Sequence, residues 1–187
     1  MKKVLLVLIG FMLAGCASMG MPGSISERVS GFDNTKEIVM EPAGVFRSFT
    51  EAYLIKLGLY KTSKMNENDA VLVVLVKGAH SFADKESLQF NIDGEMVSLE
   101  SIDLLTDIET KEGSEYFSVY NESSKRYTIS KDLIQMLINA KSVWVKVNLS
   151  KDYLEGEFSK DSIASARPAF RKFYTKVWGN QSNRGEK

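Results

Sequence analysis

The segment Leu88–Leu99 constrains the fold most strongly, because it places an Asp-Gly pair between two short alternating runs, LQFNI and EMVSL. Asp93 and Gly94 suit a two-residue hairpin turn in which both positions have positive φ. The turn sets three cross-strand pairs: Ile92 with Glu95, Phe90 with Val97, and Leu88 with Leu99. A slip by one residue would divide the apolar side chains between core and water. The sequence therefore predicts an antiparallel hairpin with one buried face.

Further strands are predicted where β-branched or alternating apolar residues recur. The run Val71–Val76 is continuous and rich in valine, which favours a central strand over a short buried helix. Residues 53–60 carry apolar side chains at both parities, which predicts a strand covered on both faces for part of its length. The remaining predicted strands are residues 103–110, 116–120, 142–149 and 153–158.

Two helices are predicted in the second half of the chain. Ser130 is a favourable N-cap, and a helical stripe follows it, formed by Leu133, Ile134, Leu137 and Ile138. A second helix should begin near Ser165 or Arg167, with Pro168 in its first turn, and end at Gly179. Its stripe comprises Ala169, Phe170, Phe173, Tyr174, Val177 and Trp178, and we interpret it as core packed on a sheet.

The first fifteen residues have the layout of an export signal. Lys2 and Lys3 precede the apolar run Val4–Leu13, and the small residues Ala14 and Gly15 follow it. This run is about half the roughly 20 apolar residues that a membrane span needs. The segment therefore predicts a cleaved signal peptide and not a permanent membrane anchor.

The tetrapeptide Leu13-Ala14-Gly15-Cys16 resembles the cleavage-and-lipidation motif of bacterial lipoproteins. The resemblance implies that Cys16 receives a diacylglyceryl thioether, becomes the first mature residue, and is acylated on its amino group with a palmitate-type chain. Several acyl chains give stable membrane attachment, since each buried methylene contributes about 0.8 kcal/mol. In Gram-negative lipoproteins, Ala17 in place of aspartate implies the outer membrane, on its periplasmic face. The alternative is a plain signal peptide in which Cys16, the only cysteine, is an ordinary small residue.

Charge and composition limit the possible partners. The chain has 24 basic and 24 acidic residues, and removal of residues 1–15 takes Lys2 and Lys3 with it. The mature chain therefore carries a small excess of acids, which argues against a nucleic-acid partner. A hydrophobic fraction of 44% and an aromatic fraction of 10% predict a folded domain and not a disordered chain.

Strands followed by two late helices predict an α+β fold, with an antiparallel sheet or a two-sheet core and both helices in the C-terminal half. A pure β-sandwich is the alternative. The predicted organisation is a signal peptide (1–15), an acylated cysteine with a flexible tether (16–27), one globular domain (28–179) and a polar tail (180–187). An alternative for residues 17–27 is a first strand, because Met19, Met21 and Ile25 alternate in places.

No catalytic or metal-binding constellation stands out in the sequence. His80 is the only histidine, and a Ser-His-acid hydrolase would need it as its base, but no Gly-x-Ser-x-Gly elbow is present. Zinc needs more histidine or cysteine ligands than this chain offers. Asp103, Asp107 and Glu109 share one parity in a strand, which could suit calcium. We interpret them instead as a solvated face opposite Leu104 and Ile108, and predict no metal or other cofactor.

The sequence therefore predicts a non-enzymatic, lipid-anchored protein that binds or helps to assemble another envelope component. It would be held at the periplasmic face of the outer membrane through acyl chains on Cys16. Trp144 is out of phase with the valines around it, so it is the predicted exposed contact. Two alternatives stay open: a small-molecule or lipid carrier with an internal apolar pocket, and a hydrolase that uses His80.

Overall fold

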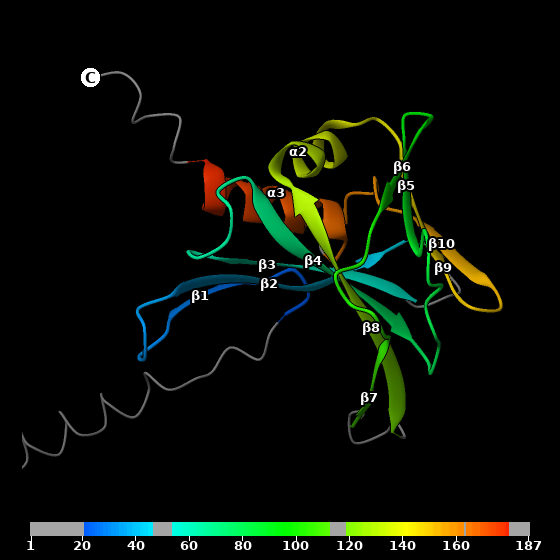
Figure 1. The fold of residues 1–187 in the computed structure, drawn as a ribbon. Coiled ribbons are helices and arrows are strands. Elements are labelled where there is room, and N and C mark those ends of the chain that lie inside the picture. Colours follow the sequence, from blue (N-terminus) through cyan, green and yellow to red (C-terminus); the bar gives the residue numbers. More distant parts are fainter. Residues whose placement is uncertain (1–20, 47–53, 113–118, 163, 180–187) are drawn as a thin grey trace, which may run out of the picture.

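The computed structural model describes residues 21–46, 54–112, 119–162 and 164–179, which form two antiparallel sheets and two helices (Figure 1). The six-stranded sheet contains, in spatial order, β1 (Ile25–Val29), β2 (Lys36–Val45), β3 (Ile55–Thr62), β4 (Asp69–Lys77), β8 (Tyr120–Ser130) and β7 (Asp107–Lys111). The four-stranded sheet contains β10 (Tyr153–Glu157), β9 (Val143–Asn148), β5 (Leu88–Ile92) and β6 (Glu95–Leu99). The predicted α+β class with a two-sheet core is confirmed.

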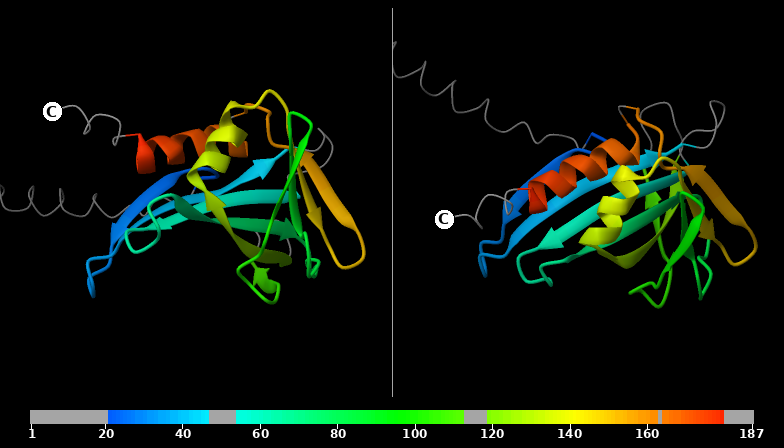
Figure 2. Two further views of the ribbon diagram at one scale, coloured as in Figure 1. Left: turned by 45° about the horizontal axis from the view of Figure 1, so that its top comes forward. Right: turned by 90° about the horizontal axis from the view of Figure 1, so that it is seen from above.

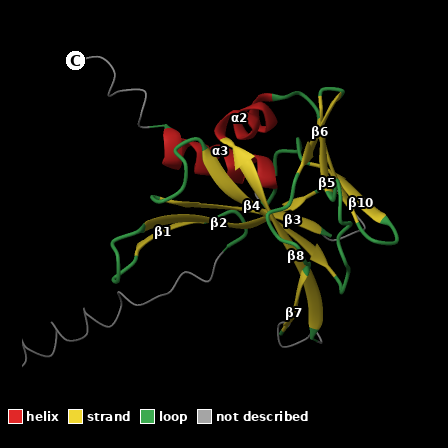
Figure 3. Cartoon of the chain, viewed as in Figure 1, coloured by secondary structure: helices red, strands yellow, loops and turns green. Residues whose placement is uncertain are grey.

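The helices α2 (Lys131–Asn139) and α3 (Ala166–Trp178) lie over one face of the six-stranded sheet (Figures 2 and 3). The Ser130 hydroxyl accepts a 3.1 Å hydrogen bond from the Leu133 backbone N–H, which caps α2. Pro168 lies in the first turn of α3, where a helix needs no N–H donor. No helix among the described residues covers the opposite face of the larger sheet.

The core lies between the larger sheet, the two helices and the smaller sheet. Leu72, Val74 and Val76 of β4 have no exposed surface and form its centre. The rings of Phe158, just after β10, and Phe170 of α3 pack edge to face with centroids 5.0 Å apart. Aromatic contacts of this kind fill the junction between the smaller sheet and the helices.

The predicted hairpin is confirmed in its turn and in its register. Asp93 and Gly94 have φ values of 51° and 99°, and Phe90 pairs with Val97. The Asp93 carboxylate also accepts a 2.8 Å hydrogen bond from the Ser142 backbone N–H. Because Ser142 precedes β9, the turn residue helps to hold β9 beside β5.

The predicted tether at residues 16–27 is wrong at its C-terminal end. β1 begins at Ile25, which pairs with Met40 of β2, so the alternative of a first strand describes this part better. The Gly23 N–H also donates a 3.0 Å hydrogen bond to the Glu41 carbonyl. Pairing with β2 satisfies the backbone hydrogen-bonding groups of this polar segment. Its polar side chains are compatible with a strand, because an edge strand does not need apolar side chains on both faces. Residues 1–20 and 180–187 lie outside the described residues.

The predicted strand at residues 103–110 is wrong in its first half. Only β7, from Asp107, is a strand, and residues 103–106 form a loop. The cause is a contact with a residue distant in the sequence, because the Asp103 side chain accepts a 2.8 Å hydrogen bond from the Arg126 backbone N–H. The Asp103 carboxylate thus accepts the hydrogen bond from β8 that a backbone carbonyl of a paired strand would accept. The predicted strand at residues 116–120 lies outside the described residues except for its end, since β8 begins at Tyr120.

Candidate functional site

A row of polar side chains on the inner face of β8 holds the segment that leads from β4 to β5. The Ser123 hydroxyl accepts a 2.8 Å hydrogen bond from the His80 backbone N–H and donates one of 2.7 Å to the Gly78 carbonyl. Lys125 donates a 3.3 Å hydrogen bond to the Ala83 carbonyl. Two residues further along β8, the Tyr127 hydroxyl shares a 2.7 Å hydrogen bond with Ser87. These contacts bring residues 78–87 across the inner face of β8.

A cleft of about 740 Å³ opens beside this segment. Lys125 lines it from β8, and the rest of its surface comes from residues 84–87 and from the chain between residues 98 and 104. Apart from Leu99 and Leu104, the side chains around it are hydroxyl or charged groups. The cleft therefore suits a ligand that forms hydrogen bonds and ion pairs.

An apolar loop, residues 101–108, borders this cleft at the edge of the larger sheet. Leu104 and Leu105 are 94% and 82% exposed, and Ile102 and Ile108 are about half exposed. Two adjacent leucines with almost no protein contact carry apolar surface that water solvates poorly. Together with its two isoleucines, the apolar loop forms a candidate contact surface.

An ion pair fixes the apolar loop to β8. The Arg126 guanidinium donates a 2.7 Å hydrogen bond to the Asp103 carboxylate, and the Ile102 N–H donates one of 3.0 Å to the Arg126 carbonyl. The hydrogen bonds from Arg126 hold the pKa of Asp103 below its ordinary value. Asp103 therefore stays ionised at neutral pH, and the exposed leucines stand on an anchored segment.

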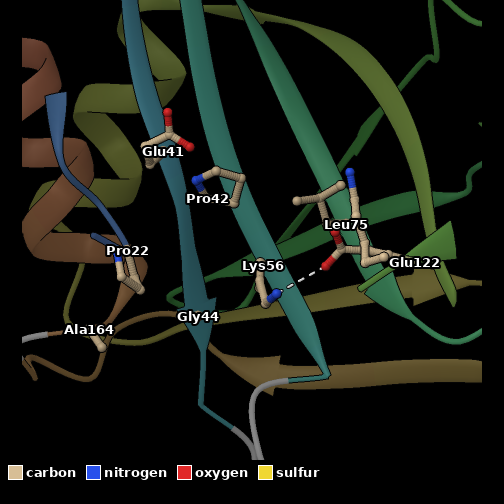
Figure 4. A pocket seen from close by; sticks show the side chains of 9 residues that line it. Pro22, Glu41, Pro42, Gly44, Lys56, Leu75, Glu122 and Ala164 are labelled. Carbon is tan, nitrogen blue, oxygen red and sulfur yellow. Dashed lines mark hydrogen bonds and ion pairs between the residues drawn. The ribbon is translucent and has the colours of Figure 1, made fainter. Parts of the chain in front are cut away.

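A second pocket, of about 430 Å³, is lined by Lys56 and Leu75, which alternate along β3 and β4 with the buried core residues, so it lies on the face of the larger sheet away from the helices. Lys56 of β3 and Glu122 of β8 point toward one another there, 3.0 Å apart, beside Leu75 of β4 (Figure 4). The Glu122 side chain is 8% exposed and that of Lys56 is 36% exposed. The pair thus joins two strands that are separated by β4.

The structure does not assemble the hydrolase considered from the sequence. The hydroxyl of Ser123 bonds to the His80 backbone, as described above, and not to the imidazole. No hydrogen bond or ion pair joins the imidazole to another residue in the described part of the chain, and its ring packs over the Gly78 backbone. Among the described residues, no serine or carboxylate is placed against the His80 imidazole as a Ser-His-acid site requires.

The three carboxylates considered for calcium do not share a strand face. Asp103 lies before β7, outside any strand, and is engaged by Arg126, whereas Asp107 and Glu109 lie in β7. Within residues 21–46, 54–112, 119–162 and 164–179, no group of histidine, cysteine or acidic residues is arranged to hold a metal ion. The geometry needed for that calcium site is therefore missing from these residues.

Two aromatic predictions are resolved by burial. Trp144 is 44% exposed on the outer face of the smaller sheet, opposite Asn91 of β5, so its predicted exposure is confirmed. In α3, Phe170 and Phe173 are fully buried and Trp178 is 4% exposed. The interpretation of that stripe as core is confirmed.

The lipidation motif and Cys16 lie outside the described residues, so the predicted anchor stays a prediction. Within the described residues, no helix combines the length and the apolar character that crossing a bilayer requires. The chain matches no protein-family model, no curated protein and no solved structure.

Proposed function

We propose that this protein is a lipid-anchored envelope protein that binds another envelope protein through the apolar loop. The anchor is the one implied by Leu13-Ala14-Gly15-Cys16, at the periplasmic face of the outer membrane. The role is non-enzymatic. The observation that carries the binding role is the pair Leu104 and Leu105, exposed on a segment that Arg126 holds in place.

The apolar loop is suited to binding because its conformation is set before a partner arrives. Burial of one leucine side chain contributes about 1.5–3 kcal/mol. An anchored loop loses little conformational entropy on association, so more of this free energy is available for affinity. Ile102 and Ile108, each about half exposed, extend the same surface.

The proposed anchor would hold the domain close to the membrane. Six residues, and thus seven Cα-to-Cα steps, lie between Cys16 and Gly23, whose N–H makes the first described hydrogen bond to β2. Such a segment spans at most about 25 Å when fully extended. A partner would therefore be another component at or near the same membrane surface.

The alternative of a carrier with an internal apolar pocket finds less support. Phe158, Phe170 and Tyr127 fill the space between the sheets and the helices with fully buried side chains. The 740 Å³ cleft is open at the surface and is bordered largely by hydroxyl and charged groups. A bound lipid chain would remove these polar groups from water without forming hydrogen bonds with them, which is unfavourable.

The anchor is tested by metabolic labelling with an alkyne analogue of palmitate. We expect the wild-type chain to incorporate the label and the variant Cys16→Ala to incorporate none, because the thiol is the attachment atom. The intact mass of the wild-type protein should correspond to a chain that begins at Cys16 and carries the added acyl groups. An unmodified chain, or one that begins at another residue, contradicts the anchor.

The binding role is tested by photo-crosslinking in living cells. A photoreactive phenylalanine at position 105 should give a discrete adduct, and Leu104→Asp in the same chain should reduce its yield at least tenfold, because a buried charge costs several kcal/mol. The matched control carries the photoreactive residue at Phe32, which is fully exposed in the turn between β1 and β2. The same adduct at both positions, or none at position 105, would exclude the apolar loop as the binding surface.

A further inference from the structure

Lys125 combines deep burial with few partners. It is 3% exposed, and its ammonium group donates one hydrogen bond, of 3.3 Å, to the Ala83 carbonyl. Among the described residues it forms no ion pair with any carboxylate. An ammonium group has three donors, and a charge removed from water is stable only when it is paired or fully hydrogen-bonded. Two of the three ammonium donors of Lys125 therefore have no protein acceptor among the described residues.

Other charged residues near the core have more partners than Lys125 does. Glu122, three residues earlier in β8, is 7% exposed and is paired with Lys56. Lys61 is less buried than Lys125, yet it donates hydrogen bonds to the carbonyls of Asn66, Glu67 and Asp69. Lys125 is the more deeply buried lysine and has fewer acceptors than Lys61.

Among the described residues, no carboxylate lies within ion-pair distance of the Lys125 ammonium group. Its partner in the sheet register is Val74 of β4. Burial raises the pKa of Tyr127 to about 12, so this hydroxyl is neutral. The charges of Asp103 and Lys125, which both line the cleft, act on one another, but the Asp103 carboxylate accepts its hydrogen bonds from Arg126. A carboxylate that pairs directly with Lys125 can therefore come from a ligand in the cleft.

The other charges of the cleft define what such a ligand carries. Asp84, Glu86 and Glu100 are exposed at its mouth, against one further lysine, Lys85. This excess of carboxylates repels a polyanion and attracts an ammonium group. A ligand that satisfies both Lys125 and the mouth therefore carries one negative and one positive charge.

We propose that the cleft binds a small zwitterion, an amino acid or a short peptide, whose carboxylate pairs with Lys125. Its ammonium group faces Asp84, Glu86 and Glu100, and an apolar side chain contacts Leu99 and Leu104 on the wall. This site goes beyond the proposed function and does not require lipidation, because all of its residues belong to β8 and to the wall of the cleft.

The experiment is calorimetry on the full chain purified in detergent, with glycyl-L-leucine as the probe. We expect wild-type protein to bind it, and Lys125→Met to bind it at least about tenfold more weakly, since a hydrogen-bonded charge pair is lost. Glycyl-L-leucinamide, which lacks the carboxylate, should bind the wild type at least about tenfold more weakly as well. The matched control Lys151→Met, an exposed residue between β9 and β10, should bind like the wild type.

Thermal unfolding of each variant shows whether the fold is retained. Lys125→Met should unfold at a temperature no lower than Lys151→Met, because it removes a buried charge without emptying the site. Three results would each overturn the proposal: no binding of glycyl-L-leucine by the wild type, equal binding by Lys125→Met, or tighter binding of inorganic phosphate. None of these readouts depends on Cys16 or on a partner at the apolar loop, so the proposed function is tested separately.

Discussion

Phe170→Ala is expected to lower the free energy of unfolding by about 4 kcal/mol, because it empties the junction between α3 and the sheets. Phe170 is fully buried and meets Phe158 edge to face at 5.0 Å. Its removal deletes apolar contacts with both elements and leaves a cavity that the paired strands cannot close. Urea denaturation followed by circular dichroism measures the change, and the melting temperature should fall by roughly 10 °C.

The matched control for this substitution is Lys172→Ala in the same helix. Lys172 is exposed, so its truncation should change the free energy of unfolding by less than about 0.5 kcal/mol. Alanine also favours the helix at both positions, so a difference between the two variants reports on packing. A loss below 1 kcal/mol for Phe170→Ala would show that α3 does not seal the core.

Elements with strong local signals could be predicted from the sequence. The Asp93-Gly94 turn fixed its own register, because a two-residue loop with positive φ allows one pairing. The capped helix α2 and the amphipathic helix α3 likewise carry their signals within a few residues. In each case the residues that specify the element are adjacent to the element itself.

β8 could not be predicted in the same way. Its first half, YNESSKR, has no aliphatic residue, yet Glu122, Ser123 and Lys125 are buried. Their burial depends on groups far away in the chain, such as Lys56 for Glu122 and the Gly78 carbonyl for Ser123. A search for apolar periodicity does not detect a strand whose buried residues are polar.

The apolar loop was missed for a related reason. An alternating reading of residues 103–110 places Leu104 on the face opposite the acids, which in a strand would be the buried one. The structure exposes Leu104 because Asp103 bonds to Arg126 and diverts the chain before β7 begins. The adjacent pair Leu104-Leu105 breaks strict alternation, and this break was the sequence signal that residues 103–106 are not a strand. The contact between Asp103 and Arg126 joins residues that are far apart in the sequence, and no local sequence pattern predicts it.

Lys56→Met is expected to lower the free energy of unfolding by about 2 kcal/mol, because it removes the ion-pair partner of the buried Glu122 carboxylate. The loss of one partner from a fully buried pair costs about 3–5 kcal/mol, and from an exposed pair about 0–1 kcal/mol. The Glu122 side chain is 8% exposed and that of Lys56 is 36% exposed, so this pair falls between the two limits. Chemical denaturation of the full chain measures the difference.

A double-mutant cycle separates the ion pair from the packing of the lysine stem against Leu75. Glu122→Gln keeps the shape of the side chain and removes the charge, so alone it should cost about 1 kcal/mol or less. In the double variant Lys56→Met with Glu122→Gln, no unpaired charge is left, and most of the stability lost in Lys56→Met should return. A coupling energy of about 1–2 kcal/mol between the two sites is the expected result. Additive losses would mean that Lys56 contributes through its methylene groups alone and that water solvates Glu122 without it.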